Sequence, residues 1–116
     1  MGKFIKGDIV VVPFPFSDLS SYKKRPALVV ADLSGDDLIL CQITSKNTTD
    51  EYAVELLNKE VLNGNLSVDS NIRTNKIFTA DKSIILYKAC NLTGGKMNLV
   101  TEKIIDILKK DVKYRK

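Results

Sequence analysis

The residues best suited to chemistry are three consecutive cations, Lys23, Lys24 and Arg25, which lead directly into the apolar segment 26–31. An arginine keeps its charge at neutral pH and presents a planar fork of N–H donors that matches phosphate oxygens. Pro26 disfavours helical angles at Arg25 and has no N–H to give a sheet ladder. We therefore expect Pro26 to open a strand, with Arg25 extended just before it. The pattern indicates phosphate binding, and a solvated charge run that caps a strand is the alternative.

The composition describes an ordinary globular protein. The 116 residues predict one domain, 1–116, and the net charge of +4 permits a polyanionic partner without requiring one. No apolar run approaches a membrane span, and the first residues lack the apolar stretch of a signal peptide. We therefore expect a cytoplasmic protein with no membrane partner. Cys41 and Cys90 lie in strand-like segments, where buried reduced thiols are expected, and two thiols alone form no metal site.

Short runs of aliphatic and β-branched residues, separated by turn signals, predict several strands. Pro13 is expected to end the first strand, and the polar residues 17–24 form a loop before the second. The apolar residues 84–92 fit either a strand or a helical turn followed by a strand. The other expected strands are 9–12, 26–32, 38–43, 52–56, 66–73 and 76–79.

An apolar stripe at helical spacing predicts an amphipathic helix over about 96–111. Thr93 and Asn98 are alternative N-caps. The residues of the stripe are Met97, Val100, Ile104, Ile107 and Leu108. Many short strands and one final helix predict a mainly β fold, in which a strongly bent antiparallel sheet, closed or nearly closed, carries the helix.

Several segments together resemble a known family. Residues 7–19 (GDIVVVPFPFSDL) and 24–30 (KRPALVV) resemble the start of the MazF/PemK family, the toxins of type II toxin–antitoxin systems. Residues 42–45, 69–73 and 76–83 are similar to later parts of the same family, in the same order and spacing. The resemblance covers nearly the whole chain.

This resemblance implies an SH3-like barrel and a homodimeric, metal-independent endoribonuclease that needs no cofactor. Enzymes of this kind, also called mRNA interferases, cut single-stranded RNA at specific sequences and cause growth arrest. The 2′-hydroxyl attacks the adjacent phosphate, which leaves a 2′,3′-cyclic phosphate or 3′-phosphate and a 5′-hydroxyl. The implied partner is an antitoxin with a disordered acidic C-terminal segment, which binds DNA together with the toxin. The catalytic pair of the family corresponds to Arg25 and Thr44.

The residue types agree with that chemistry. RNA supplies its own nucleophile, so the protein must stabilise a doubly charged phosphorane and assist two proton movements. The sequence contains no histidine, which excludes a mechanism based on a histidine pair. Arg25 could hold the non-bridging oxygens, and the Thr44 hydroxyl could donate a hydrogen bond to the same phosphate. A turn residue at the end of a strand is the alternative interpretation of Thr44.

A second group of candidates consists of Arg73, Asn75 and Asp18. Many relatives carry Arg-x-Asp where this chain has Arg73 and Asn75, and an amide cannot act as a base at neutral pH. Arg73 could bind phosphate or form a structural salt bridge. Asp18 could orient Arg25, serve as the base, or stabilise its loop through an Asx turn.

The expected RNA surface surrounds these positions. Cationic side chains would flank the RNA, and aromatic rings would stack on unpaired bases. The predicted RNA-binding residues are Phe16, Ser17, Tyr22, Lys23, Lys24, Ser45 and Lys46.

Two other functions fit a small barrel with basic loops. One is a non-catalytic module that binds nucleic acid or peptide. The other is a toxin of the same fold that poisons DNA gyrase; such relatives depend on a C-terminal tryptophan, and this sequence has no tryptophan.

Overall fold

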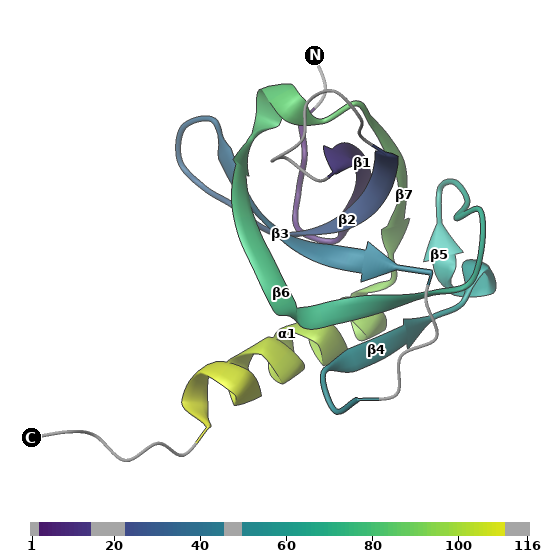
Figure 1. The fold of residues 1–116 in the computed structure, drawn as a ribbon, viewed down its shortest axis with the longest axis vertical. Helices are drawn as coiled ribbons and strands as arrows, with labels where there is room; N and C mark the ends of the chain where they lie inside the picture. Colours follow the sequence, from purple (N-terminus) through teal and green to yellow (C-terminus); the bar gives the residue numbers. More distant parts are fainter. Residues whose placement is uncertain (1–2, 15–22, 46–49, 111–116) are drawn as a thin grey trace, which may run out of the picture.

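The computed structural model describes residues 3–14, 23–45 and 50–110. In these ranges the chain forms one antiparallel sheet, two short 3₁₀ turns and a helix near the C-terminus (Figure 1). The strand order across the sheet is β4-β6-β3-β2-β1-β7-β5. The strands are β1 (Asp8–Phe14), β2 (Lys23–Asp32), β3 (Asp37–Thr44), β4 (Ala53–Leu56), β5 (Val61–Leu62), β6 (Ser70–Asp81) and β7 (Tyr87–Leu92). The 3₁₀ turns are Asn58–Glu60 and Lys82–Ile84, and the helix is α1 (Gly94–Lys109).

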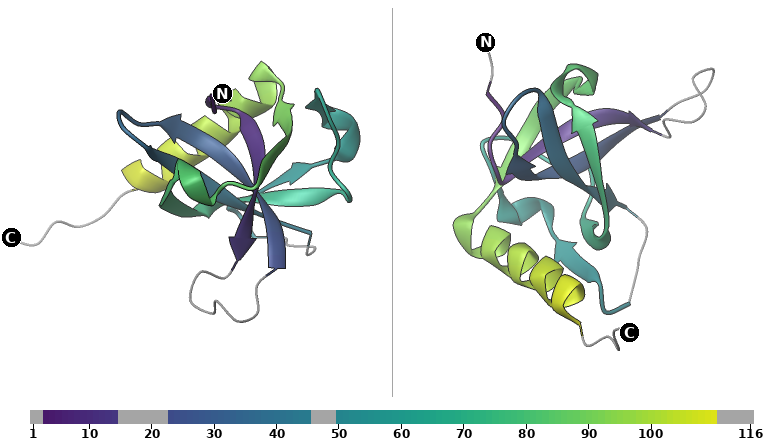
Figure 2. Two further views of the ribbon diagram at one scale, coloured as in Figure 1. Left: turned by 90° about the horizontal axis from the view of Figure 1, so that it is seen from above. Right: turned by 90° about the vertical axis from the view of Figure 1, so that its left-hand side faces the viewer.

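The sheet curls into a nearly closed barrel. Its register shifts between Ile9 and Val10, between Val29 and Ala31, and between Cys41 and Ile43. Such irregularities bend a strand and increase its local twist. Figure 2 shows the resulting curvature from two further directions, with α1 lying along the outside of the sheet. The predicted fold class, a strongly bent antiparallel sheet with a C-terminal helix, is confirmed.

Alternating side chains divide the core into two clusters on opposite faces of the sheet, as expected for strands. One cluster includes Val10, Val12, Ala27, Val29, Leu38 and Leu40. The other includes Ile9, Leu28, Cys41, Ile43 and Ile72, and it packs against Met97, Val100 and Ile104 of α1. Central strands with both faces covered form a rigid support for whatever side chains their ends carry.

The prediction that Pro26 opens its strand is wrong. The strand begins at Lys23, and Pro26 pairs with Val11 inside it. Pairing between β2 and β3 begins only at Ala27, so the missing N–H of Pro26 need not interrupt that ladder. Likewise β1 continues through Pro13, which pairs with Lys24. The three cations therefore lie on a strand instead of in a loop.

Other boundaries differ less. A single strand, β6, replaces the two predicted over 66–73 and 76–79, and residues 66–69 precede it. Of the two alternatives for residues 84–92, the structure has the helical turn followed by a strand, since a 3₁₀ turn at 82–84 comes before β7.

The helix matches its prediction, with small corrections. It starts two residues early, at Gly94, because the Thr93 side chain accepts a hydrogen bond from the Lys96 N–H at 3.2 Å and caps it. Asn98 therefore lies inside the helix. Leu108, the last member of the predicted stripe, is 72% exposed and does not join the core.

Both cysteines are buried free thiols, as predicted.

Among the glycines in the described residues, only Gly64 is required by a close contact. It has a φ of +151°, and a Cβ there would lie 1.9 Å from the Ala89 carbonyl oxygen of β7. The neighbouring Asn63 is also left-handed, with a φ of 57°, and its side chain donates to Asn91 Oδ1 at 2.9 Å. These contacts hold the 63–64 turn against β7.

Candidate functional site

A cleft of about 450 Å³ lies where the end of β3 meets the beginning of β2 and the middle of β6. Ala27 of β2 pairs with Gln42 of β3. Arg25 comes two residues before Ala27 and Thr44 two residues after Gln42, so the antiparallel register brings both to the same end of the sheet. Arg25, Thr44 and Arg73 all line this cleft, together with Lys76. The remaining lining residues are Val12, Phe14, Pro26, Ala27, Gln42, Ile43 and Phe78.

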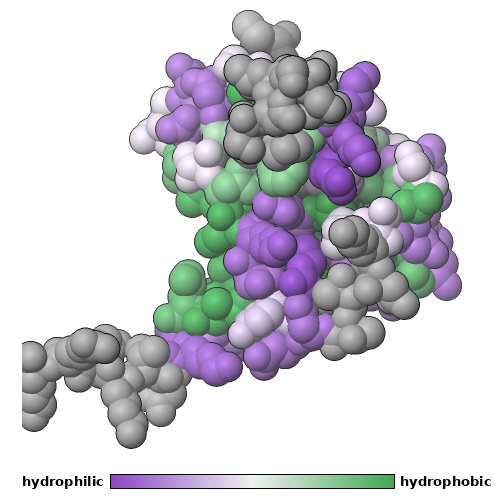
Figure 3. Space-filling view, in the orientation of Figure 1, coloured by the Kyte–Doolittle hydropathy of each residue, from purple (hydrophilic) through white to green (hydrophobic). Residues whose placement is uncertain are grey.

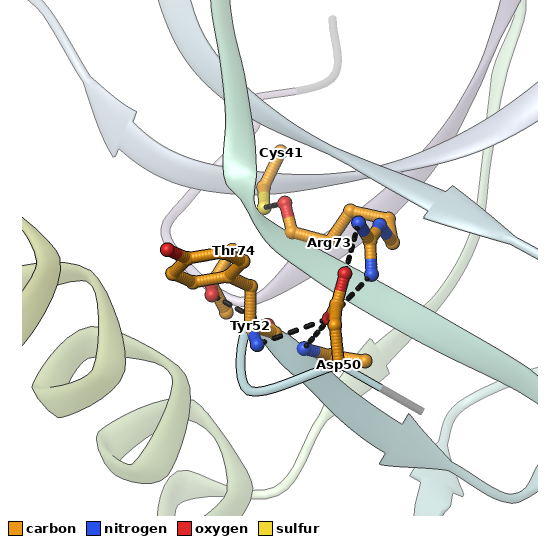
Figure 4. Close-up of polar contacts among 6 residues, drawn as sticks. Cys41, Asp50, Tyr52, Arg73 and Thr74 are labelled. Carbon is orange, nitrogen blue, oxygen red and sulfur yellow. Dashed lines mark hydrogen bonds and ion pairs between the residues drawn. The ribbon is translucent and has the colours of Figure 1, made fainter. Parts of the chain in front are cut away.

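Arg73 is held by an acidic residue that the sequence analysis did not identify. Its Nη1 and Nη2 donate to Asp50 Oδ1 and Oδ2 at 2.9 and 2.8 Å, a two-pronged ion pair (Figure 4). Asp50 Oδ1 also accepts from the backbone N–H groups of Tyr52 and Ala53 at 3.0 and 3.1 Å. The hydrogen bond from Arg73 lowers the pKa of Asp50, and the same pairing raises the pKa of Arg73.

The backbone beside Arg73 is fixed as well. The Cys41 thiol donates to the Arg73 carbonyl oxygen at 2.8 Å, and the Thr74 hydroxyl donates to the Tyr52 carbonyl oxygen at 2.6 Å (Figure 4). Burial raises the pKa of Cys41 to about 12. A thiol with that pKa stays protonated at neutral pH, so Cys41 supports the site without offering a nucleophile.

A second, larger cleft of about 850 Å³ adjoins the first and shares Arg25, Pro26 and Ile43 with it. Its walls carry Lys23, Lys24 and Ser45, three of the predicted RNA-binding residues. They also include Lys88 and the 53%-exposed Tyr87 of β7, which the sequence did not single out. The other lining residues are Val11, Gly64, Asn65, Leu66, Ser67, Val68, Ser70 and Ala89.

The remaining candidates do not all belong to this region. Asn75 is exposed and lines neither cleft. Phe16, Ser17, Asp18, Tyr22 and Lys46 lie outside the described residues.

Charge gathers along the two clefts. Lys23, Lys24, Arg25 and Lys76 form no ion pair with any acidic side chain in residues 3–14, 23–45 and 50–110, whereas Lys88 pairs with the buried Asp8 at 3.2 Å. Figure 3 shows hydrophilic residues in the middle of the face it presents, between apolar areas. Cations that have no acidic partner among the described residues, lying beside a hydroxyl group, are suited to binding phosphate groups.

Comparison with known families decides which kind of protein this is. Residues 5–108 match the family model described as "PemK-like, MazF-like toxin of type II toxin-antitoxin system". The chain belongs to the PemK/MazF toxin family. The resemblance drawn from the sequence is thereby confirmed over most of the chain. A search of the curated proteins returned no match.

Solved structures agree on the fold at low sequence identity. An endoribonuclease in complex with its cognate antitoxin, from a mycobacterial species, has a TM-score of 0.70 and 16% identity, with 96% of this chain and 100% of that chain covered. MazF in a MazE–MazF crystal structure from Deinococcus radiodurans has a TM-score of 0.73 and 18% identity, with 92% of this chain and 97% of that chain covered. The Mycobacterium tuberculosis toxin MazF-mt6 has a TM-score of 0.68 and 15% identity, with 90% of this chain and 99% of that chain covered.

In the part of the chain that the structure describes, no helix is long and apolar enough to cross a membrane. The same part of the chain contains no group of three or more His, Cys, Asp or Glu residues that could hold a metal ion.

Proposed function

We propose that this toxin is an endoribonuclease that cuts single-stranded RNA, principally mRNA, at specific sequences in the cytoplasm. The observation that carries the proposal is that Arg25 and Thr44, from two adjacent strands, line one cationic cleft. Family membership and the endoribonuclease relatives of the same fold support the same conclusion.

The cleft residues suggest how the reaction proceeds. The RNA 2′-oxygen bonds to phosphorus while the bond from phosphorus to the 5′-oxygen breaks; solvent takes the 2′-hydroxyl proton and returns one to the leaving 5′-oxygen. Arg25 would neutralise the charge that develops on the non-bridging oxygens, and the Thr44 hydroxyl would donate to one of them. The products are a 2′,3′-cyclic phosphate, or a 3′-phosphate after hydrolysis, and a 5′-hydroxyl. The reaction requires no metal in this proposal.

The two clefts together would accommodate a strand on both sides of the cut phosphate. Arg25 lines both, so nucleotides before and after the reacting phosphate can occupy different clefts. Lys23 and Lys24 would contact the backbone in the second cleft. Exposed Tyr87 offers a ring on which a base can stack.

We also propose that the toxin forms a homodimer and is inhibited by an antitoxin with a disordered, acidic C-terminal segment. The structures of relatives in complex with antitoxin support this expectation. A cationic groove attracts a carboxylate-rich segment, and such a segment needs apolar contacts as well, to offset the entropy lost when it orders.

The proposal is tested by incubating the purified toxin with a long single-stranded RNA in EDTA. Defined fragments are expected from the wild type and none from Arg25→Ala, with both proteins giving the same circular dichroism spectrum. RNA that binds and stays intact would indicate a non-catalytic module instead. Fragments made equally by Arg25→Ala would assign the cleavage to another site or to a contaminant.

A further inference from the structure

We propose that Asp50 is a positioning residue, which holds the Arg73 guanidinium in place in the cleft that Arg25 and Thr44 also line. This inference rests on the proposed function, because it assigns Asp50 a part in RNA cleavage. The two residues are 23 positions apart in the sequence and meet only in the fold.

The contact is a matched pair of hydrogen bonds, at 2.9 and 2.8 Å. Two parallel bonds between planar groups fix the plane of the guanidinium as well as its position, which a single contact cannot do. The guanidinium has further N–H donors beyond the two that Asp50 accepts. Those donors are the ones available to a phosphate in the cleft that Arg73 lines.

Asp50 is itself anchored, which separates this pair from an ordinary surface salt bridge. Its Oδ1 accepts from the Tyr52 and Ala53 N–H groups, so the carboxylate forms part of the turn that starts β4 (Figure 4). Ala53 pairs with Arg73 across β4 and β6. Residues 50–53 therefore contact both parts of Arg73, because Asp50 holds its side chain and Ala53 pairs with its backbone.

The backbone of Arg73 is also held in place, by hydrogen bonds at Arg73 itself and at the next residue. Its carbonyl oxygen accepts from the Cys41 thiol of β3, and the next residue, Thr74, donates twice to the Tyr52 carbonyl oxygen, through its N–H at 3.3 Å and its hydroxyl at 2.6 Å. The Arg73 side chain is only 11% exposed. An arginine restrained at both ends loses little further freedom when it binds a phosphate.

The electrostatics favour positioning over proton transfer. Hydrogen bonds from Arg73 and from two backbone N–H groups lower the pKa of Asp50, so it stays ionised at neutral pH and is a weak base. A carboxylate that is ionised at neutral pH is suited to holding a cation.

The test is Asp50→Asn, which keeps an oxygen for the two backbone donors and removes the charge and one acceptor for Arg73. We expect the turnover number for RNA to fall between about 10-fold and 100-fold, the range that misplacing a group near the reaction produces. The affinity for an uncleavable 2′-deoxy analogue should change less than about threefold, because other cations supply most backbone contacts. In an Arg73→Ala background, Asp50→Asn should cause no further loss.

Glu51→Gln is the matched control. It removes a carboxylate one residue away that pairs with Lys110 of the helix end at 3.7 Å, and its activity should equal that of the wild type. An unchanged rate in Asp50→Asn would make the Asp50–Arg73 pair purely structural, and a raised rate would mean that Asp50 competes with phosphate for Arg73. A loss that persists in the Arg73→Ala background would show that Asp50 acts through another group. If the wild type cuts no RNA, the proposed function fails and this role fails with it, whereas the preceding outcomes overturn the role of Asp50 alone.

Discussion

Raising the salt concentration should weaken RNA binding, by an amount that depends on the number of cationic side chains in the two clefts that have no acidic partner. Six cationic side chains line them, namely Lys23, Lys24, Arg25, Arg73, Lys76 and Lys88. Two of the six are already neutralised, Arg73 by Asp50 and Lys88 by Asp8. The other four have no acidic partner in the described residues, so RNA phosphates can displace counterions from them.

The expected magnitude follows from that count. Each phosphate neutralised on a single strand contributes roughly −0.7 to the slope of log affinity against log salt, so four contribute about −2.8. With that slope, a rise from about 50 to about 200 mM salt weakens binding roughly 50-fold. Lys46, which lies outside the described residues, would make the slope steeper if it also contacts RNA.

Fluorescence anisotropy with a labelled 2′-deoxy analogue measures this slope directly, because the analogue binds and is not cut. Lys23→Gln and Lys24→Gln should each make the slope shallower by about 0.7. Lys109→Gln, the same change of charge at the exposed end of α1, should leave it unaltered. A wild-type slope shallower than about −1 would refute the idea that these clefts are the RNA surface.

Three further predictions concern the site and its support. Arg25→Lys should retain little RNA cleavage, since a point charge cannot reproduce a two-pronged phosphate contact; a rate near that of the wild type would count against the proposed role. Gly64→Ala should lower the free energy of unfolding by about 2 kcal/mol or more in urea, because its Cβ would meet a carbonyl oxygen at 1.9 Å, whereas Gly35→Ala, with open space around the Cβ, should cost only about 1 kcal/mol of backbone strain. Equal losses in the two glycine variants would contradict the close contact. The pKa of the Cys41 thiol is 9.0 in the unfolded chain and about 12 in the folded protein. The free energy of unfolding should therefore fall as the pH rises above 9.0, by up to about 1.4 kcal/mol per pH unit more than in Cys41→Ala. Parallel pH profiles of the two proteins would disprove this.

The sequence predicted those features that depend on local patterns. The apolar stripe predicted α1, Thr93 was one of its two candidate caps, and short runs of aliphatic and β-branched residues predicted the central strands. Arg25 was expected to be extended, and it is, although inside a strand instead of before one. The prediction for Pro26 was wrong because a proline is tolerated inside a strand where no neighbouring strand needs its N–H. The sequence does not show which neighbouring strands pair at that position.

The ion pair of Arg73 could not be predicted in the same way. An ion pair was one of the two alternatives for Arg73, but its partner, Asp50, follows a polar segment that carries no periodicity. The contact arises because β4 pairs with β6 and the turn before β4 returns over Arg73. Tyr87 and Lys88 were missed for a related reason, since β7 reaches the second cleft only through its pairing with β1.

The central claim is that Arg25 and Thr44 promote attack by the RNA's own 2′-hydroxyl. Sequencing both new ends of every fragment from a long single-stranded RNA, cut in EDTA, tests it most directly. We predict 5′-hydroxyl ends opposite 2′,3′-cyclic phosphate or 3′-phosphate ends at a recurring short motif, with no such ends from Arg25→Ala or Thr44→Ala. Fragments with 5′-phosphate and 3′-hydroxyl ends would contradict the mechanism, because they require water to be the nucleophile.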